Sequence, residues 1–302
     1  MVYSRPWAFT LCSTSNTDIY SATGTSASGN GFIAAGEEFD LQVLPIKYQG
    51  VVSSGEVESN SVWCNASHVT SHFFLDNSFS NHVKLSSAVV SPIPHTSSDL
   101  LASRDALTQS RVSSNQAYDF TKLYWNDVGS LKVMAATENY NAACSSPVGL
   151  ESWYECTQRG YRNIGRFYPK YFQVYDDDSI DITNSWAYPD GQSFTYMGQG
   201  FGAEAFYVEA LNAQKGSVSN YKWFDESLQA TFSLMEDSSY TTRFTSGTYN
   251  GEWVNNQLTG VESQSIGQFS GAGLNMSKDT ATYDPDGPFN LNESGSDTAI
   301  SI

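Results

Sequence analysis

The chain has 302 residues and a formal net charge of -17, with 15 lysines and arginines against 32 aspartates and glutamates. This balance argues against binding nucleic acid or an anionic lipid surface through a positive footprint. The sequence contains no run of about eighteen apolar residues, so this segment offers no candidate for insertion into a membrane.

The composition favours strands and turns over helices. Aromatic residues make up 14% of the chain and charged residues only 16%, so serine, threonine, asparagine and glycine must cover much of the surface. Aromatic and β-branched side chains suit a pleated sheet, whereas serine, asparagine and glycine weaken helix interiors. Residues 1–6 lack the basic start and apolar run of a signal peptide, so we expect any export signal to lie upstream in a longer parent protein.

Apolar and polar residues alternate in several short segments, which is the pattern of half-buried strands. In chain order these segments are residues 37–44, 130–136, 204–211 and 229–235. One helix is predicted at residues 98–111, where Asp99 could cap the first turn. Turn-rich segments such as 23–31 and 284–288 interrupt the pattern. The sequence therefore predicts an all-β chain of two immunoglobulin-like β-sandwich units in tandem, with few or no helices.

A faint internal repeat divides the chain in two. Residues 36–50 and 198–216 both show a turn, an alternating strand and a second turn. Their offset of about 160 residues matches the size of a sandwich domain with insertions. We predict a first unit at residues 1–165, with a disulfide-stapled inserted loop, and a second unit at residues 166–302.

The four cysteines include no Cys-x-x-Cys pair and no spacing typical of zinc. An even number of cysteines in an exported chain suggests disulfides. Three connectivities are possible, and the one that keeps each bridge within a local unit joins Cys12 with Cys64 and Cys144 with Cys156. Four buried free thiols are the alternative.

Two segments carry the most specific signal: Gly-Arg-Phe-Tyr-Pro at residues 165–169 and Phe-Thr-Tyr-Met-Gly-Gln at residues 194–199. Further landmarks lie at residues 5–9, 32–39, 125–131, 211–213, 219–221 and 286–289. Together they resemble the C-terminal domain of unknown function of MshQ-like proteins, which are encoded with the mannose-sensitive haemagglutinin pilus, a type IV pilus of marine and aquatic bacteria. The resemblance implies a location outside or on the surface of a Gram-negative cell, within a longer exported chain. It implies no reaction.

The segment 141–161 departs from the family pattern and looks like an insertion. A disulfide between Cys144 and Cys156 would hold aromatic rings of this segment in place, so that less conformational entropy is lost when a ligand binds them. These rings are Trp153 and Tyr154, within the loop between Cys144 and Cys156, and Tyr140 and Tyr161, which flank that loop. Such rings suit stacking on a sugar or docking to a protein, so these four are the predicted ligand-binding residues. The alternative is that the rings only cover the edge of the sandwich.

Two acidic clusters and one histidine pair are candidates for metal binding. The first cluster contains Asp176, Asp177, Asp178 and Asp181, and the second contains Asp284 and Asp286. Calcium would relieve the repulsion between these carboxylates, although a solvated turn remains the alternative because the spacing matches no EF-hand. The carboxylates could also serve a glycosidase, but the sequence does not fix their separation. His68 and His72 lack the glutamate of a His-Glu-x-x-His site, so we expect hydrogen-bonded histidines there.

No serine lies in a Gly-x-Ser-x-Gly motif and no glycine-rich loop precedes a helix, so neither a hydrolase triad nor a phosphate site has local support. We therefore expect a non-enzymatic module at the cell surface or pilus that serves in adhesion or ligand display. A glycan, a host or other surface ligand, or another pilus component is the expected partner. A structural stalk is the first alternative, and a carbohydrate-active enzyme is the second.

Overall fold

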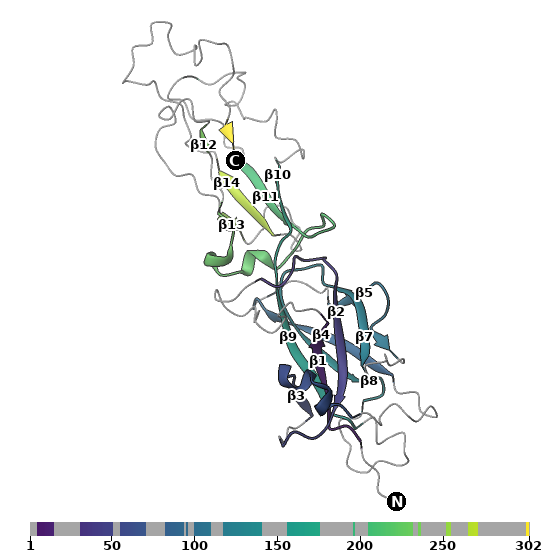
Figure 1. Cartoon of the computed structure of the whole chain (residues 1–302). Coiled ribbons are helices and arrows are strands. Elements are labelled where there is room, and N and C mark those ends of the chain that lie inside the picture. Colours follow the sequence, from purple (N-terminus) through teal and green to yellow (C-terminus); the bar gives the residue numbers. More distant parts are fainter. Residues whose placement is uncertain are drawn as a thin grey trace, which may run out of the picture. The chain divides into compact units, whose positions relative to one another are not determined.

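A computed structural model describes part of the chain (Figure 1). The described residues are 5–14, 31–50, 55–70, 82–93, 95, 100–109, 117–140, 156–175, 196, 205–231, 235–236, 252–254, 265–270 and 300–301. The chain divides into two compact units, of which the first comprises residues 1–171 and 211–227 and the second comprises residues 172–210 and 228–302. The segment 211–227 thus returns to the first unit, and the division predicted after residue 165 falls within a strand.

The described residues of the first unit form two sheets. Its first sheet has the strand order β1-β2-β7-β5, and all its pairs are antiparallel. The strands are β1 (Ala8–Ser13), β2 (Phe39–Ile46), β7 (Tyr118–Tyr124) and β5 (Ala102–Ser103). The strand predicted at residues 37–44 is therefore confirmed as β2.

The second sheet of this unit has the order β3-β9-β8-β4-β6. Its strands are β3 (Glu56–Glu58), β9 (Arg159–Phe167), β8 (Gly129–Thr137), β4 (Val83–Ser91) and β6 (Thr108–Gln109). The short strand β3 pairs with β9 in parallel, and the other pairs are antiparallel. The strand predicted at residues 130–136 is confirmed as β8.

The main apolar core of the first unit combines residues from both sheets. Leu131, Val133 and Ala135 of β8 are fully buried, and the residues between them are half-buried. Leu41 and Phe120 of the first sheet belong to the same cluster. Because alternate residues of a strand face opposite sides, this core leaves the intervening positions of β8 facing outward. The first unit is a β-sandwich, as predicted.

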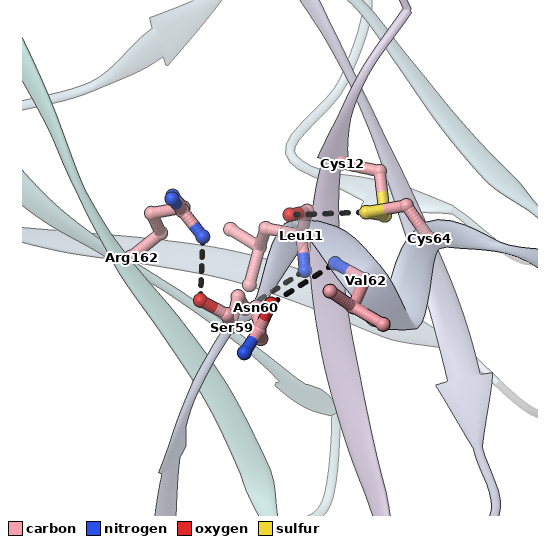
Figure 2. Close-up of a disulfide and its surroundings, with 7 residues drawn as sticks. All are labelled: Leu11, Cys12, Ser59, Asn60, Val62, Cys64 and Arg162. Carbon is pink, nitrogen blue, oxygen red and sulfur yellow. Dashed lines mark hydrogen bonds between the residues drawn. A yellow bond between two sulfur atoms is a disulfide. The ribbon is translucent and has the colours of Figure 1, made fainter. Parts of the chain in front are cut away.

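A smaller apolar cluster packs around the start of β1. Its buried members are Ala8, Cys12, Leu44, Ile46, Val57, Val69 and Ala117. Two 3-10 turns, η1 (Ser61–Cys64) and η2 (Ala66–His68), belong to the segment beside this cluster. The disulfide between Cys12 and Cys64, with Cα atoms 5.8 Å apart, fastens this segment to β1 and confirms the predicted pair (Figure 2). Next to the bridge, the Leu11 N–H donates to the Ser59 hydroxyl at 2.9 Å.

The second unit is also built from strands. Its larger sheet has the order β10-β11-β14-β13, and a separate strand pair joins β12 with β15. The strands are β10 (Tyr171–Tyr175), β11 (Ala205–Leu211), β12 (Met235–Glu236), β13 (Glu252–Val254), β14 (Ile266–Ser270) and β15 (Ile300–Ser301). The strand predicted at residues 204–211 is confirmed as β11.

The prediction of an all-β chain with tandem sandwich units is confirmed. The helical elements found in the described ranges are short 3-10 turns, which also include η5 (Tyr221–Trp223) and η6 (Glu226–Leu228). None of the helices in the described part is long and apolar enough to cross a membrane.

The helix predicted at residues 98–111 is wrong over its described part, which forms β5 and β6 instead. Leu101 enters the sandwich core, and its N–H donates to the Ser87 hydroxyl at 3.0 Å. The Leu85 N–H donates to the Leu107 carbonyl at 2.8 Å. Neighbouring strands thus take up backbone groups that a helix would pair internally, and this tertiary pairing outweighs the local pattern.

The strand predicted at residues 229–235 is wrong over its first half. Residues 229–231 form no strand, and β12 starts only at Met235. The carbonyl of Ala230 accepts the indole N–H of Trp253 at 2.8 Å. A side chain therefore occupies an acceptor that a strand ladder would use.

Candidate functional site

An outward-facing cluster on the second sheet contains two of the predicted ligand-binding residues. We call it the Glu56 network, and its members are Glu56, Lys132, Tyr140, Arg159 and Tyr161. The Lys132 ammonium donates to Glu56 Oε2 at 2.6 Å, and Arg159 Nη2 lies 2.8 Å from Glu56 Oε1. One carboxylate of β3 therefore holds a cation from β8 and another from β9.

Each cation of the Glu56 network also lies over a tyrosine ring. Lys132 Nζ is 4.2 Å from the ring centroid of Tyr161, and Arg159 Cζ is 4.9 Å from that of Tyr140. The Tyr140 hydroxyl donates to the Gly55 carbonyl at 3.2 Å. A cation–π contact contributes about 0.5–1 kcal/mol at an exposed site, so these contacts help to fix both rings in place.

The strand register explains why these side chains share a face. Glu56 lies beside Arg159 in the parallel pair of β3 and β9. Arg159 and Tyr161 are two residues apart on β9 and so point to the same side, whereas the buried Gly160 between them faces the opposite way. Lys132 alternates with the core residues of β8 and also points outward.

The charges of the Glu56 network stabilise one another. The hydrogen bond from Lys132, together with the positive charges of Lys132 and Arg159, lowers the pKa of the Glu56 carboxyl from its ordinary value of 4.5, against a smaller opposing effect of burial. Arg5 lies close enough to Tyr140 to interact with it electrostatically, and burial lowers the pKa of Arg5. The side chains of Glu56 and Lys132 are each 29% exposed, so part of the network remains open to solvent.

Two polar atoms on β9 lack a hydrogen-bond partner among the described residues. They are Arg159 Nε and Asn163 Oδ1, and both are shielded from solvent. Arg159 and Asn163 stand two positions before and after Tyr161, so the three residues form one row on the outward face. One hydrogen-bond donor and one acceptor, on opposite sides of Tyr161, therefore have no partner among the described residues.

Two of the four predicted ligand-binding residues lie in the described part of the chain, and a binding role for them stays a prediction. Tyr140 and Tyr161 are brought together in the Glu56 network. Trp153 and Tyr154 lie outside the described residues, so their role stays a prediction. Cys156 is disulfide-bonded, whereas Cys144, its predicted partner, lies outside the described residues, and their pairing also stays a prediction.

The predicted calcium site lies outside the described residues. This holds for Asp176, Asp177, Asp178, Asp181, Asp284 and Asp286. His72 lies outside them as well, whereas His68 is in η2 and its carbonyl accepts the Lys47 N–H at 2.8 Å. Within the described ranges, no three His, Cys, Asp or Glu side chains are grouped closely enough to hold a metal ion. Calcium binding therefore stays a prediction.

The sequence does not reveal Glu56, Lys132 or Arg159 as members of a site. The strand β3 is only three residues long, and it pairs with a strand far along the chain. No local pattern therefore places Glu56 beside Arg159. The alternation of Arg159 and Tyr161 around a glycine is a signal that could have identified the β9 half of the network.

A second polar cluster, which we call the Asp127 clasp, holds the segment 211–227 within the first unit. Asp127 is 4% exposed and accepts the N–H groups of Val128, Ser219 and Asn220 at 2.8–3.1 Å, as well as the Ser219 hydroxyl. Asn220 in turn donates its amide to the Val128 carbonyl at 3.3 Å. These donors saturate the carboxylate, so the Asp127 clasp has a structural role.

The Asp127 clasp joins two of the segments that carry the family resemblance, residues 125–131 and 219–221. Other such segments meet nearby, because the Ala213 N–H donates to the Ala35 carbonyl and the Ala35 N–H donates to the Tyr168 carbonyl, both at 2.8 Å. The resemblance therefore rests largely on residues that hold the first unit together. The Glu56 network lies on different segments and is a separate feature of this chain.

Comparison with known proteins gives a family but no activity. No curated protein matches the sequence. Among solved structures, the chain is similar to FdeC, an Escherichia coli adhesin, with 8% identity and a TM-score of 0.30, over 91% of this chain and 57% of that one. A likeness at this TM-score supports no statement about function.

Two sequence profiles cover nearly the whole chain. Residues 5–120 match DUF6701, second domain, and residues 127–297 match DUF6701, third domain. The two matches meet between positions 120 and 127, within the first compact unit. Since the third-domain profile alone covers more than half of the sequence, the chain belongs to the DUF6701 family.

Proposed function

We propose that the chain is an exported, non-enzymatic surface module for adhesion or ligand display, and that the Glu56 network and the segment 141–161 form its contact surface. The observation that supports this most is the meeting of Tyr140 and Tyr161 in one network, although they flank the Cys144–Cys156 loop on opposite sides in the sequence. Tyr140 contacts Arg159, so the residues before and after this loop lie side by side.

The chemistry of the Glu56 network suits a sugar. Tyrosine rings present an apolar face on which the C–H groups of a sugar can pack. Charged and amide side chains around the rings can bond to hydroxyl groups and so fix the orientation of the ligand. Because the cations already hold the rings, less side-chain entropy is lost when a ligand binds.

The cellular context belongs to the same proposal. The Cys12–Cys64 disulfide supports export, because disulfides persist in oxidising compartments. We place the chain on the surface of a Gram-negative bacterium, in a longer MshQ-like parent associated with the mannose-sensitive haemagglutinin pilus. This context rests on the resemblance of the motif segments. The proposed partner is a glycan, a host or other surface ligand, or another pilus component.

A glycan array and a surface-attachment assay on the full chain test this function. The variant Y140L/Y161L removes both rings of the network, and W153A/Y154A removes the two rings of the segment. We expect each to lower binding about tenfold or more, because buried aromatic residues dominate many interfaces. The control is Tyr48→Leu, which removes a 61% exposed tyrosine outside the network. Binding that persists in both folded double variants would show that the contact surface lies elsewhere.

A structural stalk is the second candidate, and one observation favours it. The Glu56 network also ties the short edge strand β3 to its neighbours, which a stalk would need as well. A wild-type chain that binds nothing on the array, together with variants that differ only in stability, would favour this role. Release of sugars from polysaccharides would instead favour a carbohydrate-active enzyme.

Calcium binding is a supplementary proposal that rests on the sequence. The proposed ligands are Asp176, Asp177, Asp178 and Asp181. A cation that binds only the folded chain raises its melting temperature by mass action. An excess of chelator should therefore lower the melting temperature, and added calcium should restore it. An unchanged melt under both conditions would leave a solvated turn.

A further inference from the structure

The outward face around the Glu56 network is richer in cations than the chain as a whole. The outward strand positions on β3, β4, β8 and β9 carry the cations Lys84, Lys132 and Arg159 and the carboxylates Glu56 and Glu58. Glu138, one residue beyond β8, adds a third carboxylate. Cations and carboxylates are thus equal in number here, whereas the whole chain has 15 cations and 32 carboxylates.

Both cations of the Glu56 network remain partly accessible to a ligand. The side chain of Lys132 is 29% exposed and that of Arg159 is 35% exposed, although each already pairs with Glu56. Hydrogen bonds between such cations and a carboxylate or sulfate group are stronger than those between neutral groups. Lys132 and Arg159 stand on neighbouring strands with Tyr161 between them, so an anionic group seated there would meet two cations and a ring.

We propose that this face binds acidic polysaccharides, which carry carboxylate or sulfate groups, in preference to neutral ones. The inference rests on the proposed function, because it names the class of ligand for the same surface. Glu56 acts in this scheme as an internal anion that partly neutralises Lys132 and Arg159. Its removal should therefore strengthen the binding of an anionic ligand, whereas removal of Lys132 should weaken it.

Three dextrans with one glucan backbone provide the test: plain dextran, carboxymethyl dextran and dextran sulfate. Their affinities for the full chain are measured by titration in buffer of fixed ionic strength. We expect at least one acidic dextran to bind about tenfold or more tightly than plain dextran, the gain expected from one hydrogen bond between charged groups. The comparison of the two acidic dextrans separates carboxylate from sulfate recognition.

Two near-isosteric variants that break the same ion pair make the test specific. Lys132→Gln removes one cation from the site and should weaken the binding of the acidic dextran by about tenfold. Glu56→Gln removes one carboxylate and should strengthen the binding by about threefold. The control is Lys122→Gln on β7 of the other sheet. It breaks a more exposed ion pair, that of Lys122 with Asp105, and should change the affinity by less than about twofold.

The outcomes separate the inference from the proposed function. Equal affinity for neutral and acidic dextrans would overturn the inference and leave the adhesion function standing. A loss of binding in both Lys132→Gln and Glu56→Gln would also overturn it, because the ion pair would then matter only for the fold. Absence of binding to every dextran and to every glycan of the array would overturn both. Melting curves of each variant establish that it is folded.

Discussion

At the scale of single residues, Glu56 connects three strands through one carboxylate. Each of its oxygens pairs with a different cation, and each cation lies over a tyrosine ring. A half-buried carboxylate in this setting favours its charged form. Its contribution to stability must therefore depend on pH.

The lowered pKa of Glu56 predicts the direction of that dependence. The pKa of the Glu56 carboxyl is lower in the folded chain than in the unfolded chain, where it has its ordinary value of 4.5. Glu56 therefore stabilises the fold fully at pH values above 4.5. This stabilisation is lost as the pH falls through the pKa of the folded chain. Glu56→Gln should therefore cost roughly 0.5–1 kcal/mol at neutral pH and progressively less in acid. Urea denaturation at several pH values measures this difference.

The control for this prediction is Glu58→Gln, which removes an exposed carboxylate two residues away. Its effect on the free energy of unfolding should stay within about 0.5 kcal/mol. A cost of Glu56→Gln that is constant from neutral to acid pH would show that the carboxylate contributes through its shape and not through its charge.

Asp127 shows the opposite use of a carboxylate at the residue scale. It is buried, and backbone N–H groups and a hydroxyl surround it. Asp127→Asn replaces charge-assisted hydrogen bonds by neutral ones and forces the Ser219 hydroxyl to accept instead of donate, so it should lower the free energy of unfolding by about 2 kcal/mol. Asp225→Asn, an exposed change in the same segment, should have an effect within about 0.5 kcal/mol.

Hydrogen exchange distinguishes a local from a global effect of this change. We expect the amides of Ser219 and Asn220 to lose protection in Asp127→Asn before the strands of the sandwich do, because both amides donate to the replaced carboxylate. Unchanged protection of these two amides in a destabilised variant would show that the Asp127 clasp does not hold the segment 211–227.

At the scale of elements, the Cys12–Cys64 disulfide fastens the 3-10 turns η1 and η2 to β1. The bridge closes a loop with a sequence separation of 52 residues. Under the loop-entropy account, removing a bridge of this span costs about 4 kcal/mol. The double variant C12A/C64A should therefore unfold at a lower denaturant concentration than the wild type. A difference below about 1 kcal/mol would mean that the unfolded chain is already restricted in this region.

The strands that the sequence predicts correctly share one property: apolar residues at alternating positions are buried. This holds for β8, where Leu131, Val133 and Ala135 are buried. The predicted helix fails because Leu101 and its neighbours pair with strands that are distant in sequence, and a local pattern does not contain that information.

The candidate site was partly predictable for a related reason. Tyr140 and Tyr161 stand out because they flank the Cys144–Cys156 loop, which lies in a segment that departs from the family pattern. Glu56 does not stand out, because its partners come from two other strands through a parallel pairing and a sheet register. A single sequence therefore indicates aromatic residues near a local loop, but it does not indicate ion pairs that depend on long-range strand order.

At the scale of the whole molecule, a chain with a net charge of -17 gathers cations and tyrosines on one face of its first unit. The long-range repulsion of an anionic ligand is screened by salt over about 10 Å at 0.1 M ionic strength, whereas contacts at the site are screened less. Binding of an acidic polysaccharide should therefore persist at moderate salt. Affinities measured at several salt concentrations test this expectation, and complete loss of binding at 0.1–0.2 M salt, about the physiological range, would contradict it.

The most direct test of a ligand-binding face on the first unit is hydroxyl-radical footprinting of the full chain. The chain is exposed to radicals alone and then with the glycan that it binds most strongly on the array, and the oxidation of each tyrosine is measured by mass spectrometry. The ligand should protect Tyr140 and Tyr161 from oxidation and leave the exposed Tyr48 unchanged. Protection that is absent from both Tyr140 and Tyr161 while the glycan is bound would contradict this expectation.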